Sequence, residues 1–186
     1  GAGGQLGKAV CESQFLSKFD MMAFDKTKAD ITDLNLLSDI FEKLQPDVVI
    51  NAAAYTNVNE AESDIKTAKL VNAKGPNYLA KLSKKFGAIL IHFSTDYVFD
   101  GLKRRPYLED DDVNPVNNYG RTKLAGEELI AAEAMQYYIL RTSWVMGSVG
   151  NNFARTILNK AAIGQEIKIV EDQIGTPTSV DLLTKV

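Results

Sequence analysis

The stretch Ala88-Ile-Leu-Ile-His-Phe93 is a short and almost wholly apolar run, and the polar residues Ser94-Thr95-Asp96 follow it directly. Such a run is typical of a strand that is covered on both faces of a parallel sheet. Similar apolar runs occur at Met21-Met-Ala-Phe24, Val48-Val-Ile50 and Tyr137-Tyr-Ile-Leu140. Helical segments are expected between and beside them, over 5–18, 34–44, 60–86 and 119–135. The alternation predicts an α/β fold, a Rossmann-type doubly wound parallel sheet with helices on both faces.

The organisation along the chain follows from this pattern. Asp33 is placed to cap the helix over 34–44, and Gly75-Pro76 is expected to bend or divide the long helix over 60–86. A division into two parts, residues 1–150 and residues 151–186, is expected. A glycine loop normally joins a buried strand to a helix, so a first strand before Gly1 and a smaller C-terminal domain after Val186 are expected outside the printed sequence.

Composition narrows the function classes. The 186 residues are 45% apolar and 24% charged, which suits a globular domain with a sizeable core. The net charge of −3 gives no electrostatic case for binding nucleic acid or an anionic membrane. No apolar run approaches membrane-spanning length. Cys11 is the only cysteine, so an internal disulfide is excluded and a cytoplasmic location is expected.

The chain opens on a glycine-rich stretch, Gly1-Ala-Gly-Gly-Gln-Leu-Gly7, with glycines at positions 1, 4 and 7. Glycine lets the backbone turn tightly and approach a pyrophosphate, whose charge is favoured at a helix N-terminus. An ordinary glycine-rich turn would look the same in isolation. The spacing, taken with the strands that follow, predicts a dinucleotide-binding loop of the short-chain dehydrogenase type. Residues 1–150 are accordingly expected to form an NAD(P)-binding domain, and residues 151–186 the start of a substrate-binding portion.

Three further segments lie where a dinucleotide would pass. Asp25 ends the second expected strand, where an acid can bind the adenosine ribose hydroxyls, although a turn aspartate is equally consistent. Asp30-Ile31 could flank the adenine or approach a helix cap. Asn51-Ala-Ala-Ala-Tyr-Thr56 ends the third strand with small side chains that allow close approach, or simply tight packing. Asp25 favours NADH, whereas Lys26 and Lys28 keep NADPH open.

Tyr119 and Lys123 are four residues apart, which places both on one face of a helix. A nearby ammonium is expected to lower the pKa of the tyrosine and make it a proton donor at neutral pH.

His92, the only histidine, is interpreted as a packed or hydrogen-bonded strand residue rather than a catalyst. With no histidine or cysteine cluster, no metal site is predicted. A Ser-His-Asp hydrolase is disfavoured because no Gly-x-Ser-x-Gly elbow occurs.

The chain resembles the dTDP-4-dehydrorhamnose reductases, a family of extended short-chain dehydrogenase/reductases. The resemblance covers essentially the whole sequence. It is carried by five ordered motifs, which are His92-Phe-Ser-Thr-Asp-Tyr-Val-Phe-Asp-Gly101, Asn118-Tyr-Gly-Arg-Thr-Lys-Leu-Ala-Gly-Glu127, Arg141-Thr-Ser-Trp-Val145, Asn151-Asn-Phe-Ala154 and Asp172-Gln-Ile-Gly-Thr-Pro-Thr178.

This resemblance implies reduction of the C4 ketone of dTDP-4-dehydro-L-rhamnose by NADPH or NADH. Tyr119 would then donate a proton, Lys123 would hold the nicotinamide ribose, and Thr95 would polarise the carbonyl. Asp96 and Trp144 would contact the dTDP-sugar together with Thr95. The positions that match the family's cofactor contacts are Gly4, Gln5, Leu6, Asp25, Asp30, Ile31, Ala54, Tyr55 and Thr56, beside Gly1 and Gly7 of the loop.

The resemblance is compatible with a homodimer, but the family's interface Mg²⁺ is not expected because the residues after the glycine loop are Lys8-Ala9. Two alternatives stay open. One is a nucleotide-sugar epimerase or dehydratase of the same superfamily, which shares the glycine loop and Tyr-x-x-x-Lys. The other is a non-catalytic regulatory subunit of the methionine adenosyltransferase type, which shares Ser-Thr-Asp-Tyr-Val-Phe. Trp144 favours the reductase over both.

Overall fold

The computed structural model describes residues 1–150 and 152–186 of the chain. Its main sheet has three strands in the order β1 (Val48–Asn51), β2 (Ile89–Thr95), β3 (Tyr137–Thr142), and all of them are parallel. Asn51 lies opposite His92, and Thr95 lies opposite Thr142. The parallel α/β fold predicted from the alternation of strands and helices is confirmed.

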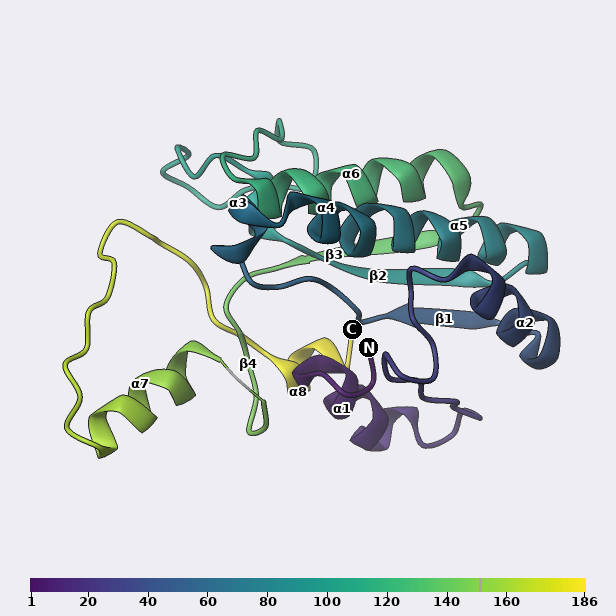
Figure 1. Ribbon diagram of the computed structural model, residues 1–186, viewed down its shortest axis with the longest axis horizontal. Coiled ribbons are helices and arrows are strands. Elements are labelled where there is room, and N and C mark those ends of the chain that lie inside the picture. The colour runs from purple at the N-terminus through teal and green to yellow at the C-terminus, as the bar shows by residue number, and fades with distance from the viewer. Residues whose placement is uncertain (151) are drawn as a thin grey trace.

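Helices cover both faces of this sheet (Figure 1). One face carries α4 (Ile65–Lys69), α5 (Gly75–Phe86) and α6 (Asn118–Glu133), and α2 (Leu34–Leu44) packs against α5. The other face carries α1 (Gln5–Glu12) and α8 (Val180–Leu183). The core lies under the first layer, where the buried residues are Ile31, Leu37, Phe41, Leu79, Ala80, Leu82, Leu90 and Ile130.

The helices begin at the capping residues that the sequence offers. The side chain of Asp33 accepts a hydrogen bond from the Leu36 amide and caps α2, as predicted. Asn117 caps α6 through the amide of Gly120. At the other end of α5, Gly87 has a φ of 73°, the left-handed conformation that commonly ends a helix.

The long helix expected over 60–86 is divided, as Gly75-Pro76 suggested. It consists of α3 (Glu60–Ser63), α4, a π-helical turn η2 (Leu70–Lys74) and α5, which begins at Gly75 with Pro76 in its first turn. Gly126 of α6 faces this turn, and a Cβ there would lie 2.2 Å from the Asn72 carbonyl oxygen. The π turn therefore packs directly against the helix that carries Tyr119 and Lys123.

The strand predicted at Met21–Phe24 is wrong for the described structure. Among the described residues the segment has no ladder partner, and its backbone hydrogen bonds to other segments are those that the Phe24 carbonyl accepts from the Gly1 amino group and the Ala2 amide. A strand requires a hydrogen-bonded neighbour, so the segment stays irregular. The helix predicted over 5–18 is also shorter, comprising α1 and a 3₁₀ turn, η1 (Gln14–Leu16).

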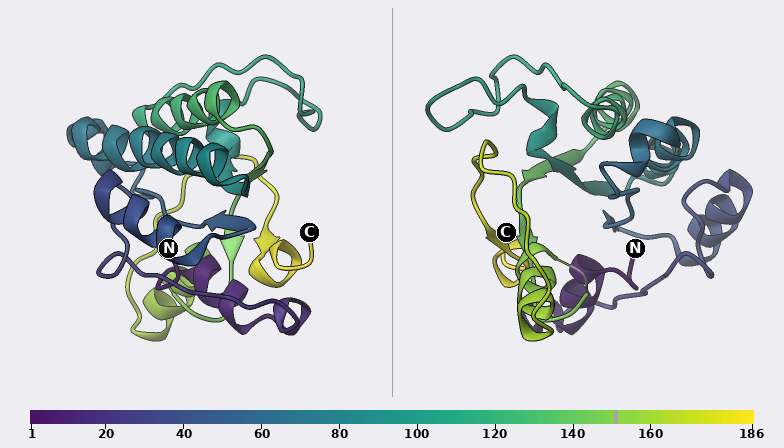
Figure 2. Two further views of the ribbon diagram at one scale, coloured as in Figure 1. Left: turned by 90° about the vertical axis from the view of Figure 1, so that its right-hand side faces the viewer. Right: turned by 60° about the vertical axis from the view of Figure 1, so that its left-hand side comes forward.

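The C-terminal elements lie beside α1, on the side of the sheet away from α5 and α6 (Figure 2). They are β4 (Val145–Met146), α7 (Phe153–Ala162), β5 (Thr178–Ser179) and α8. The strands β4 and β5 form a two-stranded parallel sheet that spans the predicted boundary between residues 150 and 151. Ser179 caps α8 by accepting a hydrogen bond from the Leu182 amide. The division into two domains stays a prediction.

Candidate functional site

The predicted site residues gather at the carboxyl edge of the main sheet. Ala54-Tyr55-Thr56 follow β1, Thr95 ends β2, and Asp96 opens the 3₁₀ turn η3 (Asp96–Val98). The first turns of α6 bring Tyr119 and Lys123 against β2 and η3. In open parallel sheets this edge is where ligands bind, because loops from several strands meet there.

The glycine loop is pressed against the end of β1. A Cβ on Gly1 would lie 2.4 Å from the Ala52 carbonyl carbon, and a Cβ on Gly7 would lie 2.1 Å from the Gly1 carbonyl oxygen. Neither position can hold a larger residue without moving backbone. Gly4 caps α1, so this turn leads directly into the helix N-terminus, while Gln5 and Leu6 form its first residues. The loop therefore has the close approach expected of a phosphate-binding turn.

Asp25 and Asp30 lie in two tight turns after this loop. The Asp25 carboxylate accepts hydrogen bonds from Thr27 and from the Lys28 amide, and the bond from the Thr27 hydroxyl is the main reason why its pKa is lowered. Gly3 passes close to Asp25, since a Cβ on Gly3 would lie 3.6 Å from the Asp25 Cβ. Asp30 makes the same turn with Thr32.

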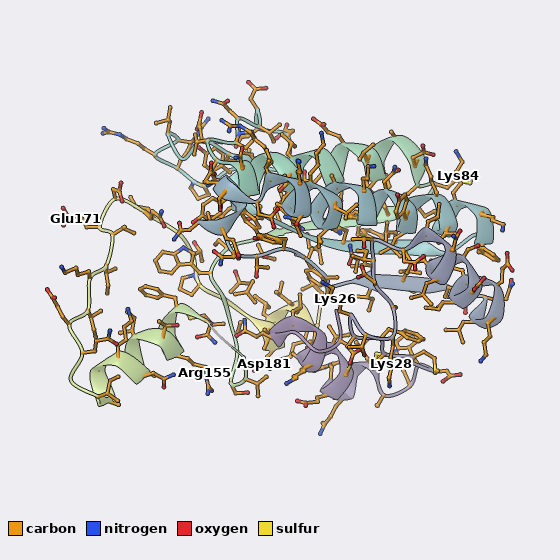
Figure 3. The ribbon with its side chains drawn as sticks, viewed as in Figure 1. Lys26, Lys28, Lys84, Arg155, Glu171 and Asp181 are labelled. Carbon is orange, nitrogen blue, oxygen red and sulfur yellow. The ribbon has the colours of Figure 1, made fainter. Side chains whose placement is uncertain are left out.

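Ile31 follows Asp30 in the second of these turns. Its side chain is buried in the core beside Gly75, where a Cβ would lie 2.7 Å from the Ile31 Cγ1. The neighbouring lysines of the Asp25 turn, Lys26 and Lys28, lie on the α1 side of the sheet, opposite Lys84 of α5 (Figure 3). A cofactor role for Ile31 stays a prediction.

The segment Ala54-Tyr55-Thr56 is held by a residue that the sequence reasoning missed. The buried side chain of Asn72 accepts from the Tyr55 amide at 2.8 Å and donates to the Tyr55 carbonyl at 3.0 Å. It also donates to the Thr122 hydroxyl on α6 at 3.2 Å. Asn72 thus ties the segment after β1 to the helix of Tyr119. A buried-position asparagine in the helical pattern was the available signal, because such a side chain requires polar partners.

Thr95, Asp96 and Tyr119 form a polar cluster at this edge. The Thr95 hydroxyl donates to the Asp96 carboxylate at 3.1 Å and accepts from the Tyr97 amide at 3.2 Å. The rings of Tyr97 and Tyr119 meet edge to face with their centroids 5.6 Å apart. A Cβ on Gly120 would lie 2.1 Å from the Tyr97 carbonyl oxygen, so this glycine lets α6 come close enough to bring Tyr119 to the cluster.

The pKa of Tyr119 departs from the expectation. Burial raises it to about 12, whereas the hydrogen bond from Thr95 acts in the opposite direction. The predicted lowering by Lys123 is wrong for this arrangement. The lysine Nζ instead donates to the Phe93 carbonyl at 2.6 Å and lies 3.2 Å from His92 Nε2. Desolvation of the phenolate therefore dominates the pKa of Tyr119.

An ion pair between Glu127 and Arg141 lies further along α6, and its Glu127 side chain is buried. Glu127, one turn beyond Lys123 on α6, accepts from the Ser94 hydroxyl of β2 and from the guanidinium of Arg141 on β3, with Nη2 at 2.7 Å. The guanidinium carbon of Arg141 also lies 5.1 Å from the Phe99 ring centroid. These contacts hold α6, β2 and β3 in one register, and fully paired buried charges resist separation.

Trp144 lies just beyond β3 and is 37% exposed. Its φ of 46° is unusual for a bulky residue, and such strain is common at functional sites. Gly175 packs against its indole, since a Cβ there would lie 2.5 Å from Nε1, and the Phe153 ring centroid is 5.5 Å away. The motifs around Gly175 and Phe153 thus meet at Trp144, although Asn151 of the second motif lies outside the described residues.

His92 is confirmed as a buried, hydrogen-bonded strand residue. The contact with Lys123 was not predicted, because periodicity alone does not show which helix covers a strand position. Among the described residues, no group of three His, Cys, Asp or Glu side chains is arranged as metal ligands. Within the same residues, no helix is both long enough and apolar enough to span a bilayer.

The parallel sheet, the glycine turn at its edge and the Tyr-x-x-x-Lys spacing on α6 place the chain among the extended short-chain dehydrogenase/reductases. The sequence profile of the RmlD substrate binding domain matches residues 1–186, and the chain belongs to that family.

Named relatives and a solved structure agree with this assignment. The chain is 43% identical to the spore coat polysaccharide biosynthesis protein SpsK of Bacillus subtilis, over 96% of this chain and 63% of that protein. It is 45% identical to a dTDP-4-dehydrorhamnose reductase of Burkholderia thailandensis, over 96% of this chain and 59% of that protein. The chain thus spans about three fifths of the length of these relatives.

The solved structure is a dTDP-4-dehydrorhamnose reductase of Bacillus anthracis in complex with NADP. It matches with a TM-score of 0.95 and 39% identity, over the whole of this chain and 66% of that one.

Proposed function

We propose that the protein reduces the C4 ketone of dTDP-4-dehydro-L-rhamnose to dTDP-L-rhamnose with a nicotinamide cofactor. The observation that supports this most directly is the meeting of Thr95, Asp96 and Tyr119 at the sheet edge that also holds the glycine loop. The relatives named as reductases of this substrate share about two fifths of their aligned residues with the chain.

The residues present suit a dinucleotide. Gly1 and Gly7 let the loop fold tightly against the end of β1, and the α1 N-terminus follows them. Asp25 lies beside the loop with a lowered pKa, chiefly through its bond from Thr27, and is therefore an anion that can accept from ribose hydroxyls. Lys26 and Lys28 supply positive charge on the same side. We propose NADPH or NADH as the cofactor, with Ala54, Tyr55 and Thr56 along its path.

A bound nicotinamide would supply the hydride, which forms the new C–H bond at C4. The protein would supply the proton and the polarisation. Because its pKa is about 12, Tyr119 carries its proton at neutral pH and can donate it to the alkoxide oxygen. The Thr95 hydroxyl lies beside it and can bond to the same oxygen. Burial of both groups excludes competing water and strengthens these interactions.

The sugar nucleotide would be held on the other side of the cluster. We assign Asp96 and Trp144 to substrate contacts, together with Thr95. Burial raises the pKa of Asp96, which suits a carboxyl group that forms hydrogen bonds in a closed site. Residues 151–186 would begin the substrate-binding portion, because Phe153 and Gly175 both pack against Trp144.

The test is an NAD(P)H oxidation assay of the purified protein with dTDP-4-dehydrorhamnose, with the product identified by mass spectrometry and NMR. We expect oxidation of the cofactor in step with formation of dTDP-rhamnose. Interconversion of sugar epimers without net oxidation, or loss of water from the sugar, would instead indicate an epimerase or a dehydratase. Binding of the cofactor without turnover, together with co-purification of a synthetase, would indicate the regulatory role.

We also propose a cytoplasmic location and a homodimer. Cys11 is exposed and is the only cysteine of the chain, which suits a reducing compartment. Light scattering of the purified protein would give its mass in solution, and a monomer at all concentrations would contradict the homodimer.

A further inference from the structure

The only histidine of the chain is a fully buried neighbour of Lys123. His92 lies opposite Asn51 in the parallel pairing of β1 with β2, so both side chains share the face that α6 covers. The exposed fractions of Asn51, His92 and Lys123 are 4%, 0% and 1%. Three polar side chains buried together must satisfy one another, because water cannot reach them.

The backbone fixes the orientation of Asn51. Its Oδ1 accepts a hydrogen bond from the Ala53 amide at 3.0 Å. The other end of the amide, Nδ2, therefore faces His92 Nδ1 at 2.8 Å and donates to it. Since Nδ1 is an acceptor, a neutral imidazole must carry its proton on Nε2. Burial holds the pKa of His92 well below its ordinary value, so the imidazole stays neutral near pH 7.

This tautomer points an N–H at the lysine. His92 Nε2 and Lys123 Nζ are 3.2 Å apart, and Nζ also donates to the Phe93 carbonyl at 2.6 Å. An ammonium has three donors and no acceptor, so it cannot accept from Nε2–H. A neutral amine can accept from Nε2–H with its lone pair while it donates to Phe93. The arrangement of Nζ, Nε2 and the Phe93 carbonyl thus fits a neutral lysine.

We propose that Asn51 and His92 are positioning residues for Lys123, that they hold its neutral amine on β2 by presenting an N–H donor to it, and that protonation of Nζ releases the side chain from His92. When the Lys123 amine gains a proton, its side chain therefore changes position. The inference rests on the proposed function only for its consequence, which is that the released ammonium becomes free to bind a cofactor ribose and to act beside Tyr119.

The charged groups around Lys123 permit this change near neutral pH. Burial lowers the pKa of Lys123 to about 8, and Glu127 acts in the opposite direction. Glu127 is itself held by Arg141 of β3, and β1 contributes the uncharged Asn51. Tyr119, on the same helix, keeps its proton in this range because its pKa is about 12. The lysine is therefore the group near His92 that changes charge between pH 7 and 9.

The first test uses the tag-free protein without ligands, in which a single histidine makes the ¹⁵N NMR signals of the imidazole unambiguous. We expect the Nε2–H tautomer throughout pH 6 to 10, and one shift of the His92 signals near pH 8 that is lost in Lys123→Met. An Nδ1–H tautomer, protonation of the imidazole at its ordinary pKa of about 6.5, or a transition that persists in Lys123→Met would overturn the proposal.

The second test reverses the polarity of the pair. In Asn51→Asp the carboxylate accepts from Nδ1–H, so His92 should become the Nδ1–H tautomer and present an acceptor to the ammonium. We expect the lysine transition to move to higher pH in this variant and to stay in place in Asn35→Asp, which adds the same charge at an exposed position of α2. A folded Asn51→Asp variant in which His92 keeps the Nε2–H tautomer would contradict the proposed positioning of Lys123 by Asn51 and His92.

If Asn51→Asp does not fold, the wild-type titration still decides the question. Because neither test includes cofactor or sugar, their failure is distinct from failure of the reductase assay.

Discussion

At the scale of single residues, the site depends on a phenol that keeps its proton. Burial raises the pKa of Tyr119 to about 12, so the phenol keeps its proton across the physiological range. A cationic neighbour would instead serve the phenolate that forms after the proton has been transferred. Tyr119 would therefore act first as a proton donor, and the cationic neighbour would act afterwards by stabilising the phenolate. The two groups need not form an ion pair in the resting protein.

Tyr119→Phe removes the proton donor and preserves the ring that packs against Tyr97. We expect turnover to fall by about 10²- to 10⁴-fold, the range for loss of a general acid, with NAD(P)H affinity nearly unchanged. Steady-state kinetics and a cofactor titration measure the two effects separately. Tyr137→Phe, at an exposed position of β3, is the matched control. Near-normal turnover of Tyr119→Phe would remove it from the acid role.

The lysine should also be visible in stability. Its pKa is lowered in the folded protein to about 8, from an ordinary 10.5. Between these values the unfolded chain binds more protons at this position than the folded one, so the free energy of unfolding should rise with pH from about 8 to 10. Denaturant unfolding of wild type and Lys123→Met at several pH values measures this gain, which the variant should lack. Equal pH dependence in both proteins would argue against a buried, titrating lysine.

At the scale of elements, close backbone approach decides where side chains can meet. Gly7 lets α1 leave the loop against Gly1, and Gly120 lets α6 reach η3. In each case the contact is between backbone atoms, which cannot rotate away as a side chain can. The glycine spacing therefore determines how closely the elements pack, as well as where a ligand can approach.

The glycine loop offers a paired test of this point. A Cβ on Gly7 would lie 2.1 Å from the Gly1 carbonyl oxygen, whereas one on Gly3 would meet only the Asp25 Cβ, at an ordinary 3.6 Å. We expect Gly7→Ala to lose NAD(P)H binding by at least about tenfold, which corresponds to 1.4 kcal/mol, and Gly3→Ala to retain it. Calorimetric titration with the cofactor gives both affinities. Equal affinities in the two variants would show that the loop does not need its tight packing.

At the scale of the whole molecule, the sheet and its first helical layer form the stable part. The central strand β2 pairs on both sides, and Leu90 and His92 on it are fully buried. The segment 163–177 has no helix or strand, and its Ile174 is fully exposed. Local stability should differ accordingly, because exchange requires opening of buried hydrogen bonds.

Hydrogen–deuterium exchange followed by mass spectrometry tests this order. We expect peptides from β2 to exchange slowest and peptides from 163–177 to exchange within the shortest labelling time. Comparable protection of the two would mean that the C-terminal segment is as firmly packed as the sheet.

The sequence predicted most of this architecture, for physical reasons that also explain its failures. Apolar runs such as Ile89–Phe93 are strands wherever a neighbour exists, and Asp33 marks the start of α2 through a local hydrogen bond. Met21–Phe24 is a similar apolar run. Strand pairing depends on residues far away in the sequence, however, so the strand was wrongly predicted. The chemistry of Tyr119 and Thr95 could be inferred from type and spacing. The roles of Asn72 and His92 could not, because they depend on which helix covers which strand.

The side chain of Gln5 has a mechanical consequence. Its Nε2 donates to the Val145 carbonyl at 2.9 Å, and its Oε1 accepts from Asn152 Nδ2 at 2.7 Å. The first residue of α1 is thereby hydrogen-bonded both to Val145, directly after Trp144, and to Asn152. A displacement of the first turn of α1 would therefore be passed to Val145, which directly follows Trp144, and to Asn152. If the dinucleotide binds at the α1 N-terminus and the sugar at Trp144 as proposed, each ligand would change how tightly the other is held.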